Sequence, residues 1–377
     1  MGKAGGKPGT PLVLLAAGGT GGHLFPAEAL AVALARRGVI VDLATDERAT
    51  RYGGKFPARA THVIPSETVR GRDLLSMART VSVVGLGIAK AWWLIGRLKP
   101  AAVVGFGGYP TIPPLLAATL RRVPTVIHDA NAVIGRANRM LAPRVSAIAT
   151  TFPGVLDGEA ALAAKATHTG NPVRLAVTQA AAVPYKVPHP AGPLRLLVFG
   201  GSQGARIMAD VVPAAIAQLD PVVRLELEIA QQAREEDIER VNASYASAGV
   251  VTSEVAPFFA DLPARIAKAH LVVSRSGAST VAELAAIGRP AILVPLPHAL
   301  DQDQLANANV LAKVGGAILL TQDAFAPDRL AAEIGALAAD PARLGTMAAA
   351  AKSVGKVDAA DRLADLVLKV AKIGAKS

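Results

Sequence analysis

The stretch "LLAAGGTGGHLFPAEALAVALARRG", residues 14–38, joins an apolar run to four glycines, a histidine and an alanine-rich helical pattern. Pro26 suits the first turn of a helix, and Gly38 suits a helix end. The stretch therefore predicts a strand over residues 11–17, a glycine-rich turn, and a helix over residues 26–37.

The same alternation of short apolar runs with helical patterns continues along all 377 residues, a length that suits two domains. Further strands are expected at residues 39–45, 101–105, 124–128, 146–150, 194–200, 225–229, 250–255, 271–274, 291–294 and 317–320. Continuous apolar strands alternating with helices indicate parallel sheets covered on both faces. A proline-rich stretch at 183–193 indicates an extended linker or loop, and 356–373 an amphipathic helix.

Composition restricts the classes of partner and chemistry. The chain has no cysteine, which excludes disulfides, thiolate catalysis and cysteine metal sites. Its formal net charge of +11 suits an anionic partner, but aromatic residues are only 4% and no nucleic-acid motif is present, so nucleic acid is not expected. No signal peptide is expected, and the apolar residues 81–96 contain Lys90 and fall short of the ~20 residues of a spanning helix.

Three glycine loops stand at predicted strand ends: "GGTGGH" (18–23), "GFGGYP" (105–110) and "GGSQGA" (200–205). A glycine loop before a helix lets the backbone approach a ligand and aims N–H groups at an anion. Neither strand–helix loop matches the Walker pattern or G-x-G-x-x-G, which disfavours a dinucleotide oxidoreductase. Glycines at such turns are often only tight turns, but three loops on two matched halves favour anion binding.

Polar residues at predicted strand ends are candidates for chemistry. His23 could take a proton from a hydroxyl, or only hydrogen bond to backbone at a helix start. In "SRSGASTVAELAAIGRP" (274–290), Ser276 and Gly277 offer donors to a phosphate. Glu283 could accept from two sugar hydroxyls or be an ordinary solvated helix residue. The polar residues 301–304 suit sugar recognition or a solvated loop.

The motifs "GGTGGH", "GFGGYP", "GNPVR" (170–174), "GGSQGAR" and "RSGASTVAELAAIGRPAILVPLPHA", in this order and spacing, resemble the MurG family. That family adds N-acetylglucosamine to undecaprenyl-linked muramyl-pentapeptide in bacterial peptidoglycan synthesis. The resemblance runs from about residue 12 to at least 320. It implies the α/β GT-B fold, with two Rossmann-like doubly wound domains and an interdomain cleft. The expected domains are 1–173 and 174–355, with a C-terminal helix (356–377) packing back on the first.

The resemblance also implies roles for individual residues, with His23 as the base for the muramyl hydroxyl. It implies that UDP-N-acetylglucosamine is bound by Thr20, Gly21, Gly22, Asn131, Arg174, Ser202, Gln203, Phe259, Ser276, Gly277, Glu283 and Gln304. It implies that the acceptor is bound by Gly18, Gly19, Gly107, Gly108 and Tyr109. The family inverts the anomeric centre by direct displacement, with no cofactor and no obligatory metal. Where the family usually has "HEQN" this chain has "HDAN" (128–131), which weakens any acceptor contact from residues 129 and 130.

Residues 70–99 mix cations with apolar and indole side chains, a pattern that suits docking to anionic lipid. The docking candidates are Leu86, Trp92, Trp93 and Arg97, and the alternative is a helix buried against the sheet. The expected location is peripheral, at the cytoplasmic face of the bacterial inner membrane, with other cell-wall assembly proteins as further partners. Alternative functions are another GT-B enzyme, such as a UDP-sugar epimerase or glycolipid glycosyltransferase, or a non-catalytic nucleotide-sugar-binding module.

Overall fold

The computed structural model describes residues 9–18, 21–47, 56–67, 74–189, 192–201, 204–299 and 302–374. The chain forms two compact units. The first runs to Arg174 and takes up the chain again from Asp358, and the second is Leu175–Val357. The predicted boundaries follow residues 173 and 355, close to these.

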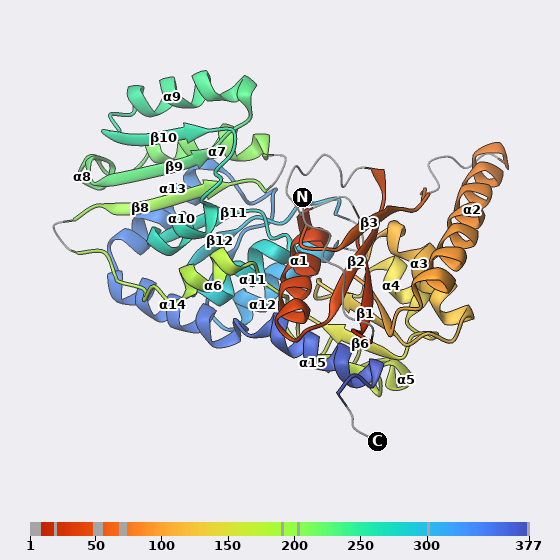
Figure 1. Ribbon diagram of the computed structural model, residues 1–377. Coiled ribbons are helices and arrows are strands. Elements are labelled where there is room, and N and C mark those ends of the chain that lie inside the picture. The colour runs from red at the N-terminus through yellow and green to blue at the C-terminus, as the bar shows by residue number, and fades with distance from the viewer. Residues whose placement is uncertain are drawn as a thin grey trace, which may run out of the picture. The chain divides into compact units, whose positions relative to one another are not determined.

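The first unit is built on a parallel sheet of seven strands, in the order β3-β2-β1-β4-β5-β6-β7 (Figure 1). Its strands are β1 (Leu12–Ala16), β2 (Ile40–Thr45), β3 (Ala60–Val63), β4 (Ala102–Gly105), β5 (Thr125–Asp129), β6 (Ala147–Thr150) and β7 (Ala166–His168). The order reverses between β1 and β4. Ligands of open α/β sheets bind beyond the carboxyl ends of the strands at such a reversal.

Helices cover both faces of this sheet. They are α1 (Gly21–Arg36), α2 (Leu74–Leu98), η2 (Tyr109–Thr111), α3 (Ile112–Leu120), α4 (Arg136–Leu141), α5 (Ala160–Ala163) and α15 (Ala359–Ala371). Neighbouring residues of β1 enter different cores: Leu15 packs in the cluster with α1 and α15, and Leu14 in the cluster with α2 and α3. Both are fully buried, which is why β1 is continuously apolar.

The second unit has a parallel sheet of six strands, in the order β10-β9-β8-β11-β12-β13. Its strands are β8 (Leu194–Phe199), β9 (Leu227–Gln232), β10 (Thr252–Ala256), β11 (Leu271–Ser274), β12 (Ala291–Leu293) and β13 (Ala317–Leu319). Its helices are α6 (Leu175–Ala181), α7 (Arg206–Ala217), α8 (Pro221–Leu225), η3 (Glu235–Asp237), α9 (Ile238–Ser247), α10 (Leu262–Lys268), α11 (Ala278–Ile287), α12 (Asp303–Lys313), α13 (Pro327–Ala338) and α14 (Pro341–Val354). The strand order reverses between β8 and β11, as it does between β1 and β4.

The predicted α/β fold of two Rossmann-like sheets is confirmed, with local differences. Helix α1 begins at Gly21 rather than Pro26, so His23 lies in its first turn. Strand β9 ends at Gln232, beyond the predicted 229. Strands β3 and β7 were not predicted, because both are short edge strands without a continuous apolar run. The proline-rich stretch 183–193 belongs to the second unit and does not mark its start.

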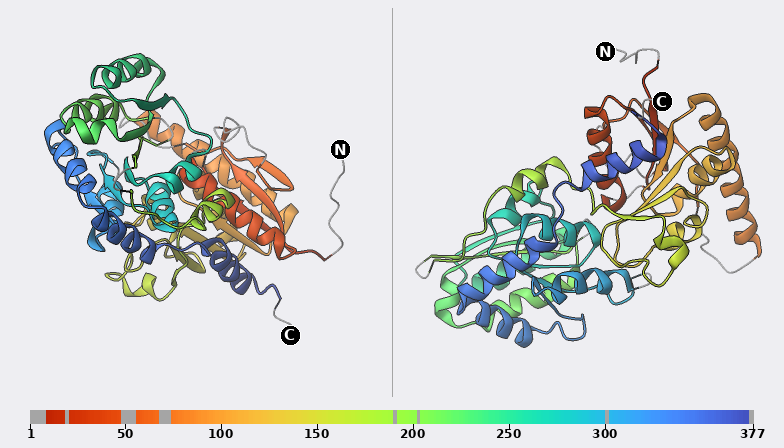
Figure 2. Two further views of the ribbon diagram at one scale, coloured as in Figure 1. Left: turned by 90° about the vertical axis from the view of Figure 1, so that its left-hand side faces the viewer. Right: turned by 90° about the horizontal axis from the view of Figure 1, so that it is seen from below.

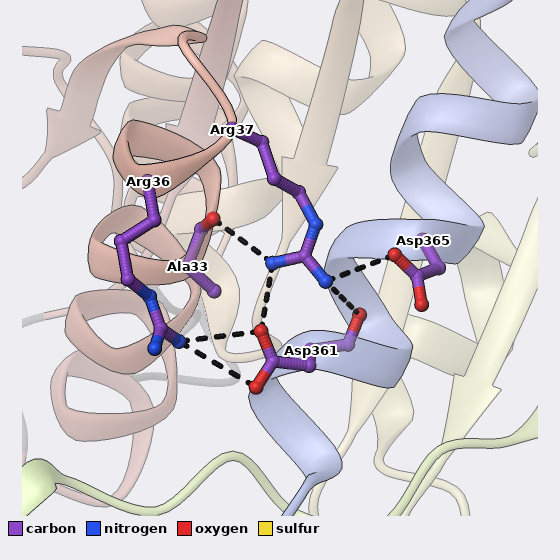
Figure 3. Close-up of polar contacts among 5 residues, drawn as sticks. All are labelled: Ala33, Arg36, Arg37, Asp361 and Asp365. Atoms are coloured by element: carbon purple, nitrogen blue, oxygen red, sulfur yellow. Dashed lines mark hydrogen bonds and ion pairs between the residues drawn. The ribbon is translucent and has the colours of Figure 1, made fainter.

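The last helix completes the first unit. Helix α15 lies beside α1 (Figure 2), and its Leu363 and Val367 are fully buried against the α1 side of the sheet. Arg37, just after α1, donates to Asp361 Oδ1 at 2.7 Å and to Asp365 Oδ1 at 3.0 Å (Figure 3). A segment more than 300 residues away in sequence thus holds the helix that begins with the glycine loop and His23.

Candidate functional site

Two glycine loops of the first unit meet at the reversal of strand order. One follows β1 and the other follows β4, whose Gly107 and Gly108 have φ angles of 83° and 73°. Only glycine adopts this region at little cost. A Cβ built on Gly108 would lie 3.3 Å from His23 Nε2, and one on Gly107 would lie 3.5 Å from His23 Cε1. The imidazole therefore rests against the backbone of the second loop.

His23 is half-buried in the first turn of α1, next to the exposed Gly22. A Cβ built on Gly22 would meet no heavy atom within 4 Å, so there is open space next to the helical turn that carries His23. On the other side of the loop, Gly18 faces the ring of Pro110, and the Tyr109 hydroxyl lies 3.5 Å from Asp46 Oδ2. Of the acceptor-binding candidates, the structure therefore brings Gly107 and Gly108 against His23, while Gly18 lies against Pro110 and Tyr109 against Asp46.

The "HDAN" turn, residues 128–131, lies next to His23. His128 is fully buried at the end of β5, and burial, with a smaller contribution from the nearby His23, lowers its pKa from 6.5 to about 4. Asp129 accepts from the backbone N–H of Asn131 at 3.1 Å and from Asn138 Nδ2 at 2.9 Å. Asp129 therefore shapes the turn that presents Asn131, and Asn138 is a supporting residue that the sequence analysis did not single out.

Arg174 is held over the start of α1. Its guanidinium lies 3.9 Å from the centroid of the Phe25 ring. The same ring lies beneath Gly21, where an added Cβ would be 3.0 Å from Phe25 Cε2. A cation stacked on an aromatic face is favoured electrostatically. Phe25 was not predicted as a site residue. The signal in the sequence was an aromatic residue near the start of a helix that follows a glycine loop.

In the second unit, the glycine loop after β8 is tied to its neighbours by Gln232. The Gly200 N–H donates to Gln232 Oε1 at 3.1 Å, and Gln232 Nε2 donates to the Pro257 carbonyl at 3.1 Å. One side chain thereby links the loops after β8 and β10. The sequence analysis missed Gln232 because it ended this strand too early. Gly19, Thr20, Ser202 and Gln203 lie outside the described residues.

The loop after β11 meets the start of α12. Ser276 Oγ donates to the Gln304 carbonyl at 2.8 Å, and Asn307 Nδ2 donates to the Ser276 carbonyl at 3.3 Å. Gln304 Oε1 accepts from the Leu296 N–H at 3.1 Å. This contact orients the Gln304 amide, whose nitrogen has no hydrogen-bond partner among the described residues. Ser276 and Gln304 are therefore brought together, as a shared binding site requires.

The remaining candidates of the second unit lie in α11 and after β10. Glu283 is only 7% exposed, so the alternative of a solvated helix glutamate is wrong. Gly277 is the N-cap of its helix, α11. Phe259, 6% exposed, lies after β10 beneath the Arg265 guanidinium, at 4.2 Å. Across the described residues, no group of three or more His, Asp and Glu side chains is arranged to hold a metal ion.

The predicted docking residues lie on α2, beside β3 and α3 in Figure 1. Leu86, Lys90, Trp93 and Arg97 recur at spacings of four, three and four, which places them on one stripe of the helix. Leu86 is 63% exposed and Trp93 79% exposed. Trp92 lies off this stripe, under the Arg121 guanidinium at 4.3 Å.

The apolar part of α2 is longer than expected. Residues 79–98 form a 20-residue stretch that is long and apolar enough to cross a membrane by length and composition alone, and 22% of its most apolar window is buried. The helix nevertheless connects β3 to β4 and buries Ala91 and Ile95 against the sheet. One face of α2 is therefore core, as the alternative predicted, and the other is exposed; docking to lipid stays a prediction.

The two parallel sheets have the same strand order, apart from a seventh strand in the first, and glycine-rich turns where the order reverses, as doubly wound ligand-binding folds do. Together with the similarity to glycosyltransferase domains and structures, they give the GT-B glycosyltransferase fold. The family comparisons agree. Residues 13–150 match the glycosyltransferase family 28 N-terminal domain, and residues 195–363 match the family 28 C-terminal domain. The chain belongs to glycosyltransferase family 28.

Comparison with individual proteins gives more specific similarities within this family. The chain is 64% identical over 367 residues, 97% of this chain and 98% of the relative, to a Rhodopseudomonas palustris (strain BisA53) protein. That relative is named UDP-N-acetylglucosamine--N-acetylmuramyl-(pentapeptide) pyrophosphoryl-undecaprenol N-acetylglucosamine transferase. The crystal structure of Acinetobacter baumannii MurG is similar, with a TM-score of 0.78 and 30% identity over 95% of this chain and 99% of that one. A UDP-N-acetylglucosamine 2-epimerase shares only the fold, with a TM-score of 0.64 and 14% identity over 98% of each chain.

Proposed function

We propose that this chain transfers N-acetylglucosamine from UDP-N-acetylglucosamine to undecaprenyl-pyrophosphoryl-N-acetylmuramyl-pentapeptide, forming the disaccharide-linked lipid of peptidoglycan synthesis. The observation that carries the proposal is 64% identity, over nearly the whole of both chains, to a relative named for this reaction. The local geometry supports it, because His23 lies against two glycines of the opposing loop at a strand-order reversal. That position suits a general base beside a bound hydroxyl.

The chemistry is a single displacement at the anomeric carbon. The muramyl hydroxyl oxygen attacks that carbon, the bond to the UDP oxygen breaks, and UDP leaves with both bonding electrons. The hydroxyl proton passes to the His23 imidazole, and the configuration inverts. Because His128 is neutral near pH 7, no second imidazolium beside His23 opposes this protonation.

We assign the nucleotide sugar chiefly to the second unit. Ser276 and Gly277 stand where α11 begins, which suits donation to a diphosphate. Glu283 suits the ribose hydroxyls because a buried carboxylate accepts two hydrogen bonds well. The Gln304 amide nitrogen suits a sugar hydroxyl. Arg174, stacked on Phe25, suits the developing charge of the leaving diphosphate.

The first test measures transfer of labelled N-acetylglucosamine from UDP to a short-chain lipid-linked muramyl-pentapeptide. Wild type is compared with His23→Ala and with Glu239→Gln, which alters an exposed residue on α9 as a matched control. Transfer by wild type and the control, with a loss of about 100-fold or more in His23→Ala, supports the function and the base. Equal transfer by all three keeps the function and removes His23 as the base.

The same assay separates the alternatives. An epimerase would convert UDP-N-acetylglucosamine to its 2-epimer without any acceptor, and a binding module would bind the nucleotide sugar without turnover. Wild type that is folded, binds UDP-N-acetylglucosamine and transfers nothing would overturn the proposed function.

We also infer that the chain binds peripherally to anionic membrane through the exposed stripe of α2. Leu86 and Trp93 present apolar surface there, between the cations Lys90 and Arg97. Such placement would bring the enzyme to its lipid-linked acceptor. Leu86→Ser with Trp93→Ser should reduce binding to anionic vesicles and leave UDP binding intact. Unchanged vesicle binding would move the docking surface elsewhere.

A further inference from the structure

Gln232 is the last residue of β9, the strand that lies between β8 and β10 in the second unit (Figure 1). The strand register sets Gln232 beside Ala256, the last residue of β10, and Gln231 beside Val198 of β8. Because the three strands are parallel, the loops that follow β8 and β10 begin on either side of Gln232. Its side chain is only 6% exposed, so a buried amide lies between the two loops.

The amide of Gln232 makes one hydrogen bond to each of these loops. Its Oε1 accepts from the Gly200 N–H at 3.1 Å, and its Nε2 donates to the Pro257 carbonyl at 3.1 Å. The two backbone partners fix the orientation of the amide, because a reversed amide would set donor against donor and acceptor against acceptor. A buried amide that pairs with both backbone groups holds Gly200 and Pro257 at a defined separation.

The loop after β8 suits an anion. A Cβ added to Gly200 would collide with the backbone nitrogen of Ala205, so the loop folds back closely on itself before α7 begins at Arg206. A Cβ on Gly204 would lie 3.1 Å from Arg234 Cγ, so the far end of the loop also rests on the chain that follows β9. A glycine turn that leads into a helix suits the phosphate groups of a nucleotide.

The loop after β10 suits a nucleobase. Phe258 directly follows Pro257 and is 68% exposed, and nucleobases stack on aromatic faces of this kind. Phe259, in contrast, is 6% exposed and lies 4.2 Å from the Arg265 guanidinium, which anchors the loop. The two loops that Gln232 links therefore suit the two ends of UDP.

A ligand that contacts both loops needs them at one separation. The nucleobase and the diphosphate are joined through the ribose, so neither group can shift along its loop independently of the other. A link that fixes the separation before binding reduces the conformational entropy lost when the ligand is bound. Gln232 supplies such a link through backbone groups of both loops.

We propose that Gln232 is a positioning residue for the nucleotide sugar, which holds the diphosphate loop and the nucleobase loop at the separation that UDP spans. The inference rests on the proposed function and adds to it the residue that couples the two halves of the nucleotide. Binding of the whole nucleotide then depends on Gln232 more strongly than binding of the nucleoside does.

Equilibrium binding of UDP and of uridine to the full chain tests this coupling. Gln232→Met keeps the length and the burial of the side chain but removes both hydrogen bonds. We expect UDP to bind about tenfold more weakly, as the loss of two neutral hydrogen bonds predicts. Uridine occupies one loop only, so its affinity should change much less. A proportionate loss for both ligands, or wild-type affinity for UDP, would overturn the coupling.

Gln231→Met is the matched control. Gln231 is the neighbouring buried amide on β9, where its Nε2 donates to the Met208 carbonyl at 3.3 Å and its Oε1 accepts from the Tyr245 hydroxyl. These partners belong to α7 and α9 and not to the two loops. Gln231→Met should therefore lower the thermal stability and leave the affinity for UDP unchanged. Equal losses of UDP affinity in both variants would reassign the effect to general destabilisation of the second unit.

Gln232→Glu gives a readout that loss of packing alone would not change. A carboxylate accepts from the Gly200 N–H but cannot donate to the Pro257 carbonyl, whereas the protonated acid can do both. Because burial raises the pKa of a carboxyl group, the affinity of Gln232→Glu for UDP, relative to wild type, should recover in mildly acidic buffer. No recovery would count against the two hydrogen bonds as the source of the positioning.

Transfer of N-acetylglucosamine to a short-chain acceptor tests the proposed function separately. In the active enzyme, Gln232→Met should raise the KM for UDP-N-acetylglucosamine and leave the KM for the acceptor unchanged. Wild type that binds UDP but transfers nothing would overturn the proposed function, while unequal losses for UDP and uridine in Gln232→Met would still support the coupling.

Discussion

Phe25 connects the start of α1 to Arg174. Its ring lies 3.9 Å from the Arg174 guanidinium and is also in contact with Gly21. Arg174 is the last residue of the first unit before α6. Ordering a guanidinium before binding lowers the entropy lost when an anion is bound.

Phe25→Leu should therefore weaken UDP-N-acetylglucosamine binding. A cation–π contact contributes ~0.5–1 kcal/mol at an accessible site, which predicts a loss of about two- to fivefold. Phe25→Tyr keeps an aromatic face and should bind like wild type. Isothermal titration calorimetry measures the affinity of wild type and both variants for UDP-N-acetylglucosamine. If Phe25→Leu binds as tightly as wild type, the Phe25 ring does not orient Arg174.

Glu283 is the second residue with a specific expected effect. If its buried carboxylate accepts from ribose hydroxyls, Glu283→Gln should weaken UDP binding by about tenfold or more, because hydrogen bonds to charged groups contribute ~1.5–3 kcal/mol. The control is Glu239→Gln, on the exposed face of α9. Comparable dissociation constants for the two variants would remove Glu283 from the site.

At the scale of elements, two kinds of contact hold α15 against α1. The ion pairs of Arg37 with Asp361 and Asp365 lie at the surface, where the carboxylates are 45% and 68% exposed. Exposed pairs contribute only ~0–1 kcal/mol each. Leu363, in contrast, is completely buried in the core shared with α1. Burial therefore dominates the attachment of α15 to α1.

Leu363→Ala should accordingly destabilise the first unit by ~2–5 kcal/mol, and Arg37→Gln by only ~1 kcal/mol. Denaturant unfolding followed by tryptophan fluorescence measures this, because both tryptophans belong to the first unit. If Arg37→Gln lowered the free energy of unfolding more than Leu363→Ala does, the ion pairs and not burial would dominate the attachment of α15.

The edge strands of the first sheet could not be predicted from the sequence. The central strands were predictable because they are buried on both faces and hence uniformly apolar. Strands β3 and β7 are bounded by a neighbour on one side only, and their residues are exposed or half-buried. A run of three or four residues of mixed polarity cannot be told from a loop in the sequence. Such a run becomes a strand only because it pairs with the neighbouring strand.

At the scale of the whole molecule, each unit carries a buried histidine that should make stability depend on pH. Burial lowers the pKa of His128 in the first unit and of His270 in the second to about 4. The unfolded chain, with an ordinary histidine pKa of ~6.5, binds more protons between these values. Stability is therefore complete above ~6.5 and falls as the pH drops towards 4, by roughly 3 kcal/mol for the fully buried His128.

Chemical denaturation near pH ~7 and ~5 tests this dependence. Tryptophan fluorescence reports the first unit, so His128→Gln should flatten its pH dependence. His298→Gln changes an exposed histidine in the second unit and should leave the dependence unchanged. An identical slope in wild type and His128→Gln would show that other groups titrate in this range.

The sequence by itself determined the two parallel sheets, their glycine-rich turns, the family resemblance and the placement of Ser276 just after a strand. These depend on hydrophobic runs, turn residues and motif spacing, all of which are written locally in the chain. Tertiary structure alone decided the packing of α15 on α1, the stacking of Arg174 on Phe25, the link through Gln232 and the stacking of Arg121 on Trp92. The physical reason is that each of these contacts joins segments far apart in sequence, and only the packing of helices on the sheets brings their side chains within reach.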